Sequence, residues 1–187
     1  MSTVIKTQAV RSEAYDPLAR ATHWLTVLLV AAEYIVGTAM PGIHGSTPLG
    51  TLIKLHLALG SGILLLVAFR IVWRLTHRPP PPPSGLPAWQ DRLSRVTHLA
   101  LYAMLILMPI TGWASASARN WPVRAFGLIP LPALVSYRAK IGFRLGDVHA
   151  DVVYWILLGL IAMHVGAALY HRFVKRDSVL SRMLPGA

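Results

Sequence analysis

Four long apolar segments constrain the fold of this chain more than any other feature. A helix needs about 20 mainly apolar residues to cross roughly 30 Å of hydrocarbon. The segments cover about residues 22–40, 51–73, 93–116 and 148–173. Only 13% of the residues are Asp, Glu, Lys or Arg, roughly half the usual share in a soluble domain. We therefore predict an all-α protein, with a single membrane-embedded domain over residues 1–187 in which four spanning helices run up-down-up-down.

The basic residues predict the orientation of these helices. Twelve of the 18 Lys and Arg residues fall on the side of the two termini, including Lys6 and Arg11 in a polar N-terminal segment that we interpret as a retained tail. Because cytoplasmic loops carry an excess of Lys and Arg, both termini are expected in the cytoplasm. The formal charge of +11 does not indicate a nucleic-acid partner, since the cations cluster at the ends of apolar segments, where they meet lipid headgroups.

The longest connection, residues 119–146, is rich in apolar residues separated by prolines. This composition predicts a segment that lies at the membrane interface. The connection before the third span contains five consecutive prolines at residues 79–83, which favour polyproline II and exclude a helix there.

The chain has eight histidines and no cysteine. The lack of cysteine excludes disulfides, thiolate-bound iron–sulfur clusters and the covalent attachment of c-type haem. Neutral imidazole is an axial ligand of haem iron, and two imidazoles on one iron favour electron transfer over oxygen binding. The histidines are therefore the candidate ligands for b-type haem.

Four histidines lie at two matched depths in the predicted spans. His149 and His164 are 15 residues apart in the fourth span, which is roughly 22 Å along a helix with directions that differ by only about 60°. His56 in the second span matches the depth of His149, and His23 in the first matches that of His164. We predict two bis-histidine iron sites, one above the other.

Two further histidines leave alternatives open. His98 lies at the depth of His23 and His164, so the pairs His23–His98 and His98–His164 are alternatives to His23–His164. If His98 is not a ligand, it can bind a haem propionate or a quinone. His171 follows His164 by seven residues on nearly the same helix face, where it is expected near a quinone or a lipid headgroup.

The sequence also resembles the bacterial cytochrome b561 family over nearly its whole length. The resemblance is carried by Tyr15-Asp16-Pro17, Arg20-Ala21-Thr22-His23-Trp24, Lys54-Leu55-His56, Gly60, Arg70-Ile71-Val72-Trp73-Arg74, Thr97-His98-Leu99-Ala100-Leu101-Tyr102, Met108-Pro109-Ile110-Thr111-Gly112-Trp113, Val148-His149 and Met163-His164.

This resemblance implies a di-haem cytochrome of the bacterial inner membrane. It implies that His23 pairs with His164, that His56 pairs with His149, and that His98 is not an axial ligand. The implied activity is transfer of electrons from an outer donor such as superoxide to ubiquinone. The alternative is a haem b membrane anchor that links a partner dehydrogenase or hydrogenase to the quinone pool.

Charged residues near the histidines suggest further roles. Lys54, Arg144 and other cations on the outer side are expected to steer a small anion to the outer haem, or else to bind lipid headgroups or haem propionates. On the inner side, Arg70 and Arg74 can hold haem propionates, or serve only as positive-inside residues. Glu33, the one acid of the first span, is expected to relay a proton or to make a polar contact within the bundle.

A third hypothesis is a haem-free transporter of divalent metal ions that uses the histidines within the spans. The scarcity of acidic residues in the spans argues against it, because cation transport usually needs carboxylates beside imidazoles.

Overall fold

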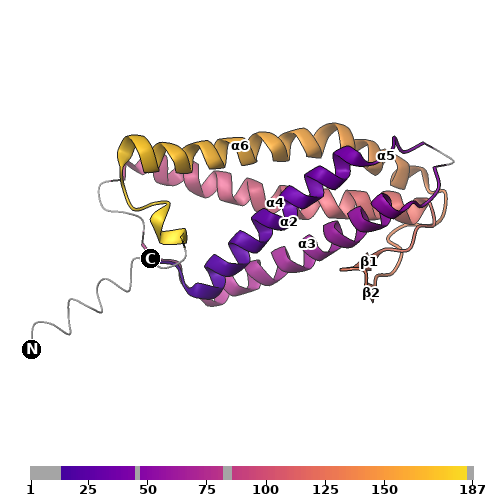
Figure 1. The fold of residues 1–187 in the computed structure, drawn as a ribbon, viewed down its shortest axis with the longest axis horizontal. Helices are drawn as coiled ribbons and strands as arrows, with labels where there is room; N and C mark the ends of the chain where they lie inside the picture. The colour runs from indigo at the N-terminus through magenta and orange to yellow at the C-terminus, as the bar shows by residue number, and fades with distance from the viewer. Residues whose placement is uncertain (1–13, 45–46, 82–85, 185–187) are drawn as a thin grey trace, which may run out of the picture.

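Four long helical segments, each antiparallel to the next, form the body of the protein (Figure 1). The computed structural model describes residues 14–44, 47–81 and 86–184. The first three helices are α2 (Pro17–Ala39), α3 (Thr51–Thr76) and α4 (Ala88–Ala118). The fourth is a continuous succession of α5 (Lys140–Val148), η1 (His149–Val153), α6 (Tyr154–Tyr170) and η2 (His171–Lys175). All four are long and apolar enough to cross a membrane. The predicted all-α, four-helix membrane bundle is confirmed.

The two ends of the bundle are different. The start of α2, the end of α3, η2 and the short helix η3 (Ser181–Met183) lie at one end, which we call the terminal end. The strands β1 (Arg124–Ala125) and β2 (Ile129–Pro130) pair at the opposite end, which we call the hairpin end (Figure 1). The predicted tail with Lys6 and Arg11 lies mostly outside the described residues, as do Pro82 and Pro83 of the proline run.

The helices extend beyond the apolar segments that predicted them. α2 begins at Pro17 because the Oδ1 atom of Asp16 accepts a hydrogen bond of 2.9 Å from the Ala19 amide, an N-cap followed by proline at the first helical position. The Trp73 indole of α3 also donates to the Asp16 carboxylate at 3.2 Å. Burial alone would raise the pKa of Asp16, but these hydrogen bonds outweigh it and lower that pKa below its usual value.

The predicted interfacial connection contains regular structure. The β1–β2 hairpin docks on α3, where the Phe126 amide donates to the Ala58 carbonyl at 3.1 Å. A Cβ on Gly62 would lie only 2.5 Å from the Phe126 ring, so this contact requires a glycine. Helix α5 begins inside the same connection and approaches α4 closely at Gly142, whose added Cβ would lie 2.5 Å from the Cβ of Ala118.

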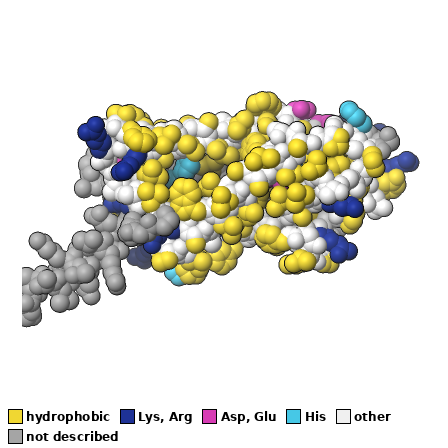
Figure 2. Space-filling view, in the orientation of Figure 1, with side chains coloured by type: hydrophobic (Ala, Val, Ile, Leu, Met, Phe, Trp, Pro, Cys, Tyr) yellow, Lys and Arg dark blue, Asp and Glu magenta, His cyan; other side chains and the backbone are white. Residues whose placement is uncertain are grey.

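Large apolar side chains mostly point outward. Leu28, Ile35 and Leu75 are 67%, 69% and 81% exposed, and small residues such as Ala114, Ala116 and Ala118 fill the helix contacts. Figure 2 shows hydrophobic side chains over the middle of one face and Lys or Arg toward both ends. Small residues between helices and apolar residues outside are expected when the surrounding solvent is lipid.

The bundle is open between its first and last helices. α2 packs on α3, α3 on α4, and α4 on α6, whereas within the described residues neither α2 nor α3 has a comparable backbone contact with α6. Side chains that project from α6 toward α2 and α3 therefore have room between them.

Candidate functional site

Two histidines from α3 and η1 face each other at the hairpin end. The ring centroids of His56 and His149 are 5.9 Å apart, with the ring planes nearly perpendicular. The Nδ1–H of His149 donates to the Met108 carbonyl of α4 at 2.8 Å. This bond sets the tautomer in which Nε2 of His149 is free to bind a metal.

His149 begins a single turn of π-helix. The π-helical segment η1 interrupts the fourth span between α5 and α6. Such turns insert one extra residue and are frequent at functional sites. The sequence predicts His149 and His164 on one regular helix. The π-helical turn changes the direction of the His149 side chain relative to that prediction. The hydropathy pattern carries no signal for this turn.

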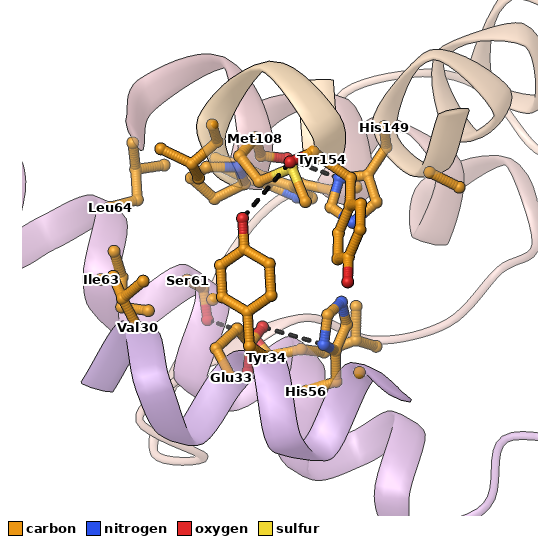
Figure 3. A pocket seen from close by; sticks show the side chains of 18 of the residues that line it. Val30, Glu33, Tyr34, His56, Ser61, Ile63, Leu64, Met108, His149 and Tyr154 are labelled. Carbon is orange, nitrogen blue, oxygen red and sulfur yellow. Dashed lines mark hydrogen bonds and ion pairs between the residues drawn. The ribbon is translucent and has the colours of Figure 1, made fainter. Parts of the chain in front are cut away.

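A cavity of about 350 Å³ adjoins this histidine pair (Figure 3). Its lining is mostly apolar and includes Gly37 and Gly112 beside the rings. A Cβ on Gly112 would lie 3.0 Å from Cε1 of His149, and one on Gly37 would lie 3.7 Å from Cε1 of His56. Glycine at these positions makes room for the two histidine rings, and the mostly apolar walls of the cavity suit a porphyrin.

The Nδ1 atom of His56 lies 2.9 Å from Oε1 of Glu33 in α2. Both side chains are largely buried, with exposed fractions of 18% and 16%. Of the two roles expected for Glu33, the structure shows the polar contact within the bundle. The sequence did not reveal that its partner is a candidate ligand.

Three histidines from different helices meet at the terminal end. The ring centroids of His23 in α2 and His164 in α6 are 6.3 Å apart. Those of His98 in α4 and His164 are 5.3 Å apart. His98 is the exposed member of the cluster, whereas His23 and His164 are half-buried. The structure thus brings together all three residues that the sequence placed at one depth.

These separations fit haem iron. If each imidazole binds one iron at about 2 Å, the two ring centroids lie about 6 Å apart. The pairs His56–His149 and His23–His164 have this separation, and each pair bridges the open side of the bundle. The ring separations of both pairs therefore suit an iron held between two imidazoles.

Arg70 and Arg74 differ in their surroundings at the terminal end. The Arg70 guanidinium donates to Thr26 Oγ1 at 2.9 Å and lies 3.5 Å from Nδ1 of His23. It also lies over the Tyr102 ring, 5.6 Å from its centroid. Arg74 is exposed on α3. Arg70 is thus held beside a candidate ligand, while the role of Arg74 at a propionate stays a prediction.

His171 begins the second π-helical turn, η2. Its ring Nδ1 pairs with Oδ2 of Asp177 at 2.6 Å. Burial raises the pKa of Asp177, but hydrogen bonds from His171 and the Val179 amide outweigh it and lower that pKa. This pair gives His171 a contact that ties the end of the fourth helix to the following turn, and the expected quinone contact stays a prediction.

The basic residues of the hairpin end fall into two groups. Lys54 and Arg144 are exposed. Arg119 instead lies between two aromatic rings, 4.8 Å from the centroid of Phe143 and 5.6 Å from that of Trp121. Cation–π contacts of this kind hold a guanidinium in place, so Lys54 and Arg144 are better placed than Arg119 to meet a solute.

Comparison with known proteins decides the family. A family model described as prokaryotic cytochrome b561 matches residues 14–186. The chain belongs to the prokaryotic cytochrome b561 family. This confirms the resemblance read from the sequence. It follows that the chain is a multi-pass bacterial membrane protein of a haem b-binding, electron-transferring family.

Curated relatives of this cytochrome b561 family member agree over most of its length. It is 30% identical over 181 residues to "Cytochrome b561 homolog 2" of Escherichia coli (strain K12), covering 92% of each chain. It is 30% identical over 179 residues to "Probable superoxide oxidase CybB" of Yersinia pestis, covering 91% of this chain and 96% of the relative.

The haem-free transporter receives no support from side-chain clusters. Among the described residues, no group of three or more His, Cys, Asp or Glu side chains is arranged to hold a metal ion directly. The histidine rings instead approach one another at separations that suit one haem iron between two imidazoles.

Proposed function

We propose that this protein carries two haem b groups and transfers electrons across the bacterial inner membrane from an outer donor such as superoxide to ubiquinone. The observation that carries the proposal is the pair of histidine contacts at opposite ends of one bundle, with ring centroids 5.9 Å and 6.3 Å apart. His56 and His149 hold the haem of the hairpin end; His23 and His164 hold the haem of the terminal end. The bound haems supply iron centres that accept and release one electron at a time.

The residues of the hairpin end suit an anionic donor if this end faces the periplasm, the orientation expected from the basic residues. Lys54 and Arg144 raise the local concentration of a small anion such as superoxide. The Yersinia pestis relative is named a probable superoxide oxidase, which supports this choice of donor. Two superoxide anions each give up one electron and leave as O₂, and one ubiquinone takes up two electrons and two protons.

At the terminal end, Arg70 and Arg74 are proposed to hold haem propionates through charge-assisted hydrogen bonds. His98 is proposed to contact a haem propionate or the quinone, since it is exposed beside His164. His171 is proposed to lie near the quinone headgroup.

Two measurements test the proposal. The purified protein should show low-spin b-type spectra with and without dithionite and contain two haems per chain; a colourless protein, or one with a single haem, contradicts it. Potassium superoxide should then reduce the haems of the isolated protein and form one ubiquinol for each two superoxide anions consumed. Reduction that requires an added dehydrogenase or hydrogenase subunit would favour the alternative of a haem-bearing membrane anchor.

A further inference from the structure

The carboxylate of Glu33 lies within the apolar part of α2, six residues before that helix ends at Ala39. A charged group within a membrane span is costly and needs a reason to be there. Its Oε1 atom lies 2.9 Å from Nδ1 of His56, which is within ion-pair distance. The two atoms are not aligned as a hydrogen bond, since Nδ1 of His56 has no hydrogen-bond partner. Its Oε2 atom is buried and, within the described residues, makes no hydrogen bond. Within the described residues, the one ion-pair partner of Glu33 is thus a candidate haem ligand.

The backbone of α3 is shaped to admit this carboxylate. Gly60 follows His56 by one helical turn, and a Cβ at that position would lie 2.9 Å from Oε1 of Glu33. A side chain on residue 60 would therefore push the carboxylate away. Figure 3 shows Glu33 directed from α2 toward the His56 ring, whose other side faces His149.

The two ligands of the hairpin end differ in what lies behind them. Nδ1 of His149 donates to the neutral Met108 carbonyl, whereas Nδ1 of His56 faces a carboxylate. A carboxylate behind a metal-bound imidazole orients the ring and makes the imidazole a more basic, stronger ligand of the metal. Its negative charge also stabilises the ferric state of the iron over the ferrous state, more strongly in a low-dielectric interior than in water.

The terminal end has the opposite charge behind its ligand. The Arg70 guanidinium lies 3.5 Å from Nδ1 of His23, and a positive charge there favours the ferrous state. The described contacts thus place a negative group beside one pair and a positive group beside the other.

We propose that Glu33 is a positioning residue that orients His56 and lowers the reduction potential of the hairpin-end haem below that of the terminal-end haem. This inference rests on the proposed function, in which His56 is an axial ligand. Its consequence is a downhill path for electrons from the hairpin end to the terminal end.

The test is a redox titration of Glu33→Gln, followed by visible spectroscopy. Gln keeps the size and shape of the Glu33 side chain beside His56, so both haems should be retained. The potential of the hairpin-end haem should rise by an amount that favours its ferrous state about tenfold, which is about 59 mV for one electron. The terminal-end haem should not shift. The titration is repeated in a His164→Ala background, which keeps only the hairpin-end haem. This shows whether the shifted potential belongs to that haem.

Matched variants separate this effect from general disturbance. Asp151→Asn removes an exposed carboxylate from η1 and should leave both potentials unchanged. Gly60→Ala keeps the charge of Glu33 but displaces it, and should raise the same potential in the same direction. Gly159→Ala makes the same substitution where no atom lies within 4 Å of the added Cβ, and should shift neither.

The outcomes distinguish this inference from the proposed function. Two haems in the wild type, with the hairpin-end potential unchanged in Glu33→Gln and Gly60→Ala, would overturn the role of Glu33 alone. Equal shifts of both haems, or loss of only the hairpin-end haem in Glu33→Gln, would also overturn it. If Glu33→Gln yields no folded protein, the Gly60→Ala and Gly159→Ala pair decides. A wild-type protein without haem would instead remove the proposed function.

Discussion

Replacing His23 and His98 separately by alanine tests which imidazole shares an iron with His164. The ring centroids of His23 and His164 are 6.3 Å apart, and those of His98 and His164 are 5.3 Å apart. Two imidazoles on one iron need a separation of about 6 Å. The first pair has this separation as it stands, whereas the second would have to open by about 0.7 Å. We therefore expect His23 to be the ligand.

The expected loss of haem in each variant follows from the number of haem sites. Loss of one axial ligand should remove one haem of the two, so the haem content of His23→Ala should fall by about half, as it should in His164→Ala. His98→Ala should keep both haems, because the ring separation of His98 and His164 is shorter than two imidazoles on one iron need. A pyridine haemochrome assay on purified protein measures haem per chain. His77→Ala, an exposed histidine at the same end, is the matched control.

One result would refute this reasoning. If His98→Ala contains a single haem and His23→Ala contains two, then His98 and His164 share the iron, and the ring separations do not report ligation. The corresponding pair at the hairpin end provides an internal comparison, since His56→Ala and His149→Ala should each lose one haem.

Three further variants test other parts of the structure. Gly112→Val places a branched side chain where a Cβ already lies 3.0 Å from a ring of the hairpin-end pair; the haem of that end should be lost in most molecules, with the other haem retained in the spectrum. Lys54→Gln combined with Arg144→Gln should slow reduction by superoxide several-fold at low ionic strength and less at high salt, whereas Arg78→Gln at the terminal end should not; equal rates at every salt concentration would exclude steering. Asp16→Ala should lower the free energy of unfolding by about 1 kcal/mol through loss of the N-cap. The pKa of Asp16 is lowered in the folded protein. This contribution to stability should therefore be complete above about pH 4 and should be lost as the pH falls through the folded-state pKa. The unfolding temperatures of the wild type and of Asp16→Ala should then become equal in acid.

Depth along the membrane could be read from the sequence. The apolar segments defined four helices because a fixed rise per residue links their length to the thickness of hydrocarbon. The 15 residues between His149 and His164 gave two levels for the same reason, and His56 and His23 matched those levels. The three observed histidine ring pairs, His56–His149, His23–His164 and His98–His164, join residues that the sequence predicts at one depth.

Depth alone could not separate His23 from His98, because both lie at the level of His164. Their difference is lateral: it depends on how far α2 and α4 stand from α6 and on the rotation of each helix, which only packing sets. The contact between Glu33 and His56 is of the same kind, since it requires α2 and α3 to approach at Gly60.

The sequence by itself determined four membrane-spanning helices and histidines at two levels, because apolar length and helical rise are local properties of the chain. Tertiary structure decided which rings face each other, which charge lies behind each ring, and the π-helical turn that directs His149. These features depend on the rotation and spacing of neighbouring helices, and those are determined by contacts between residues distant in the sequence.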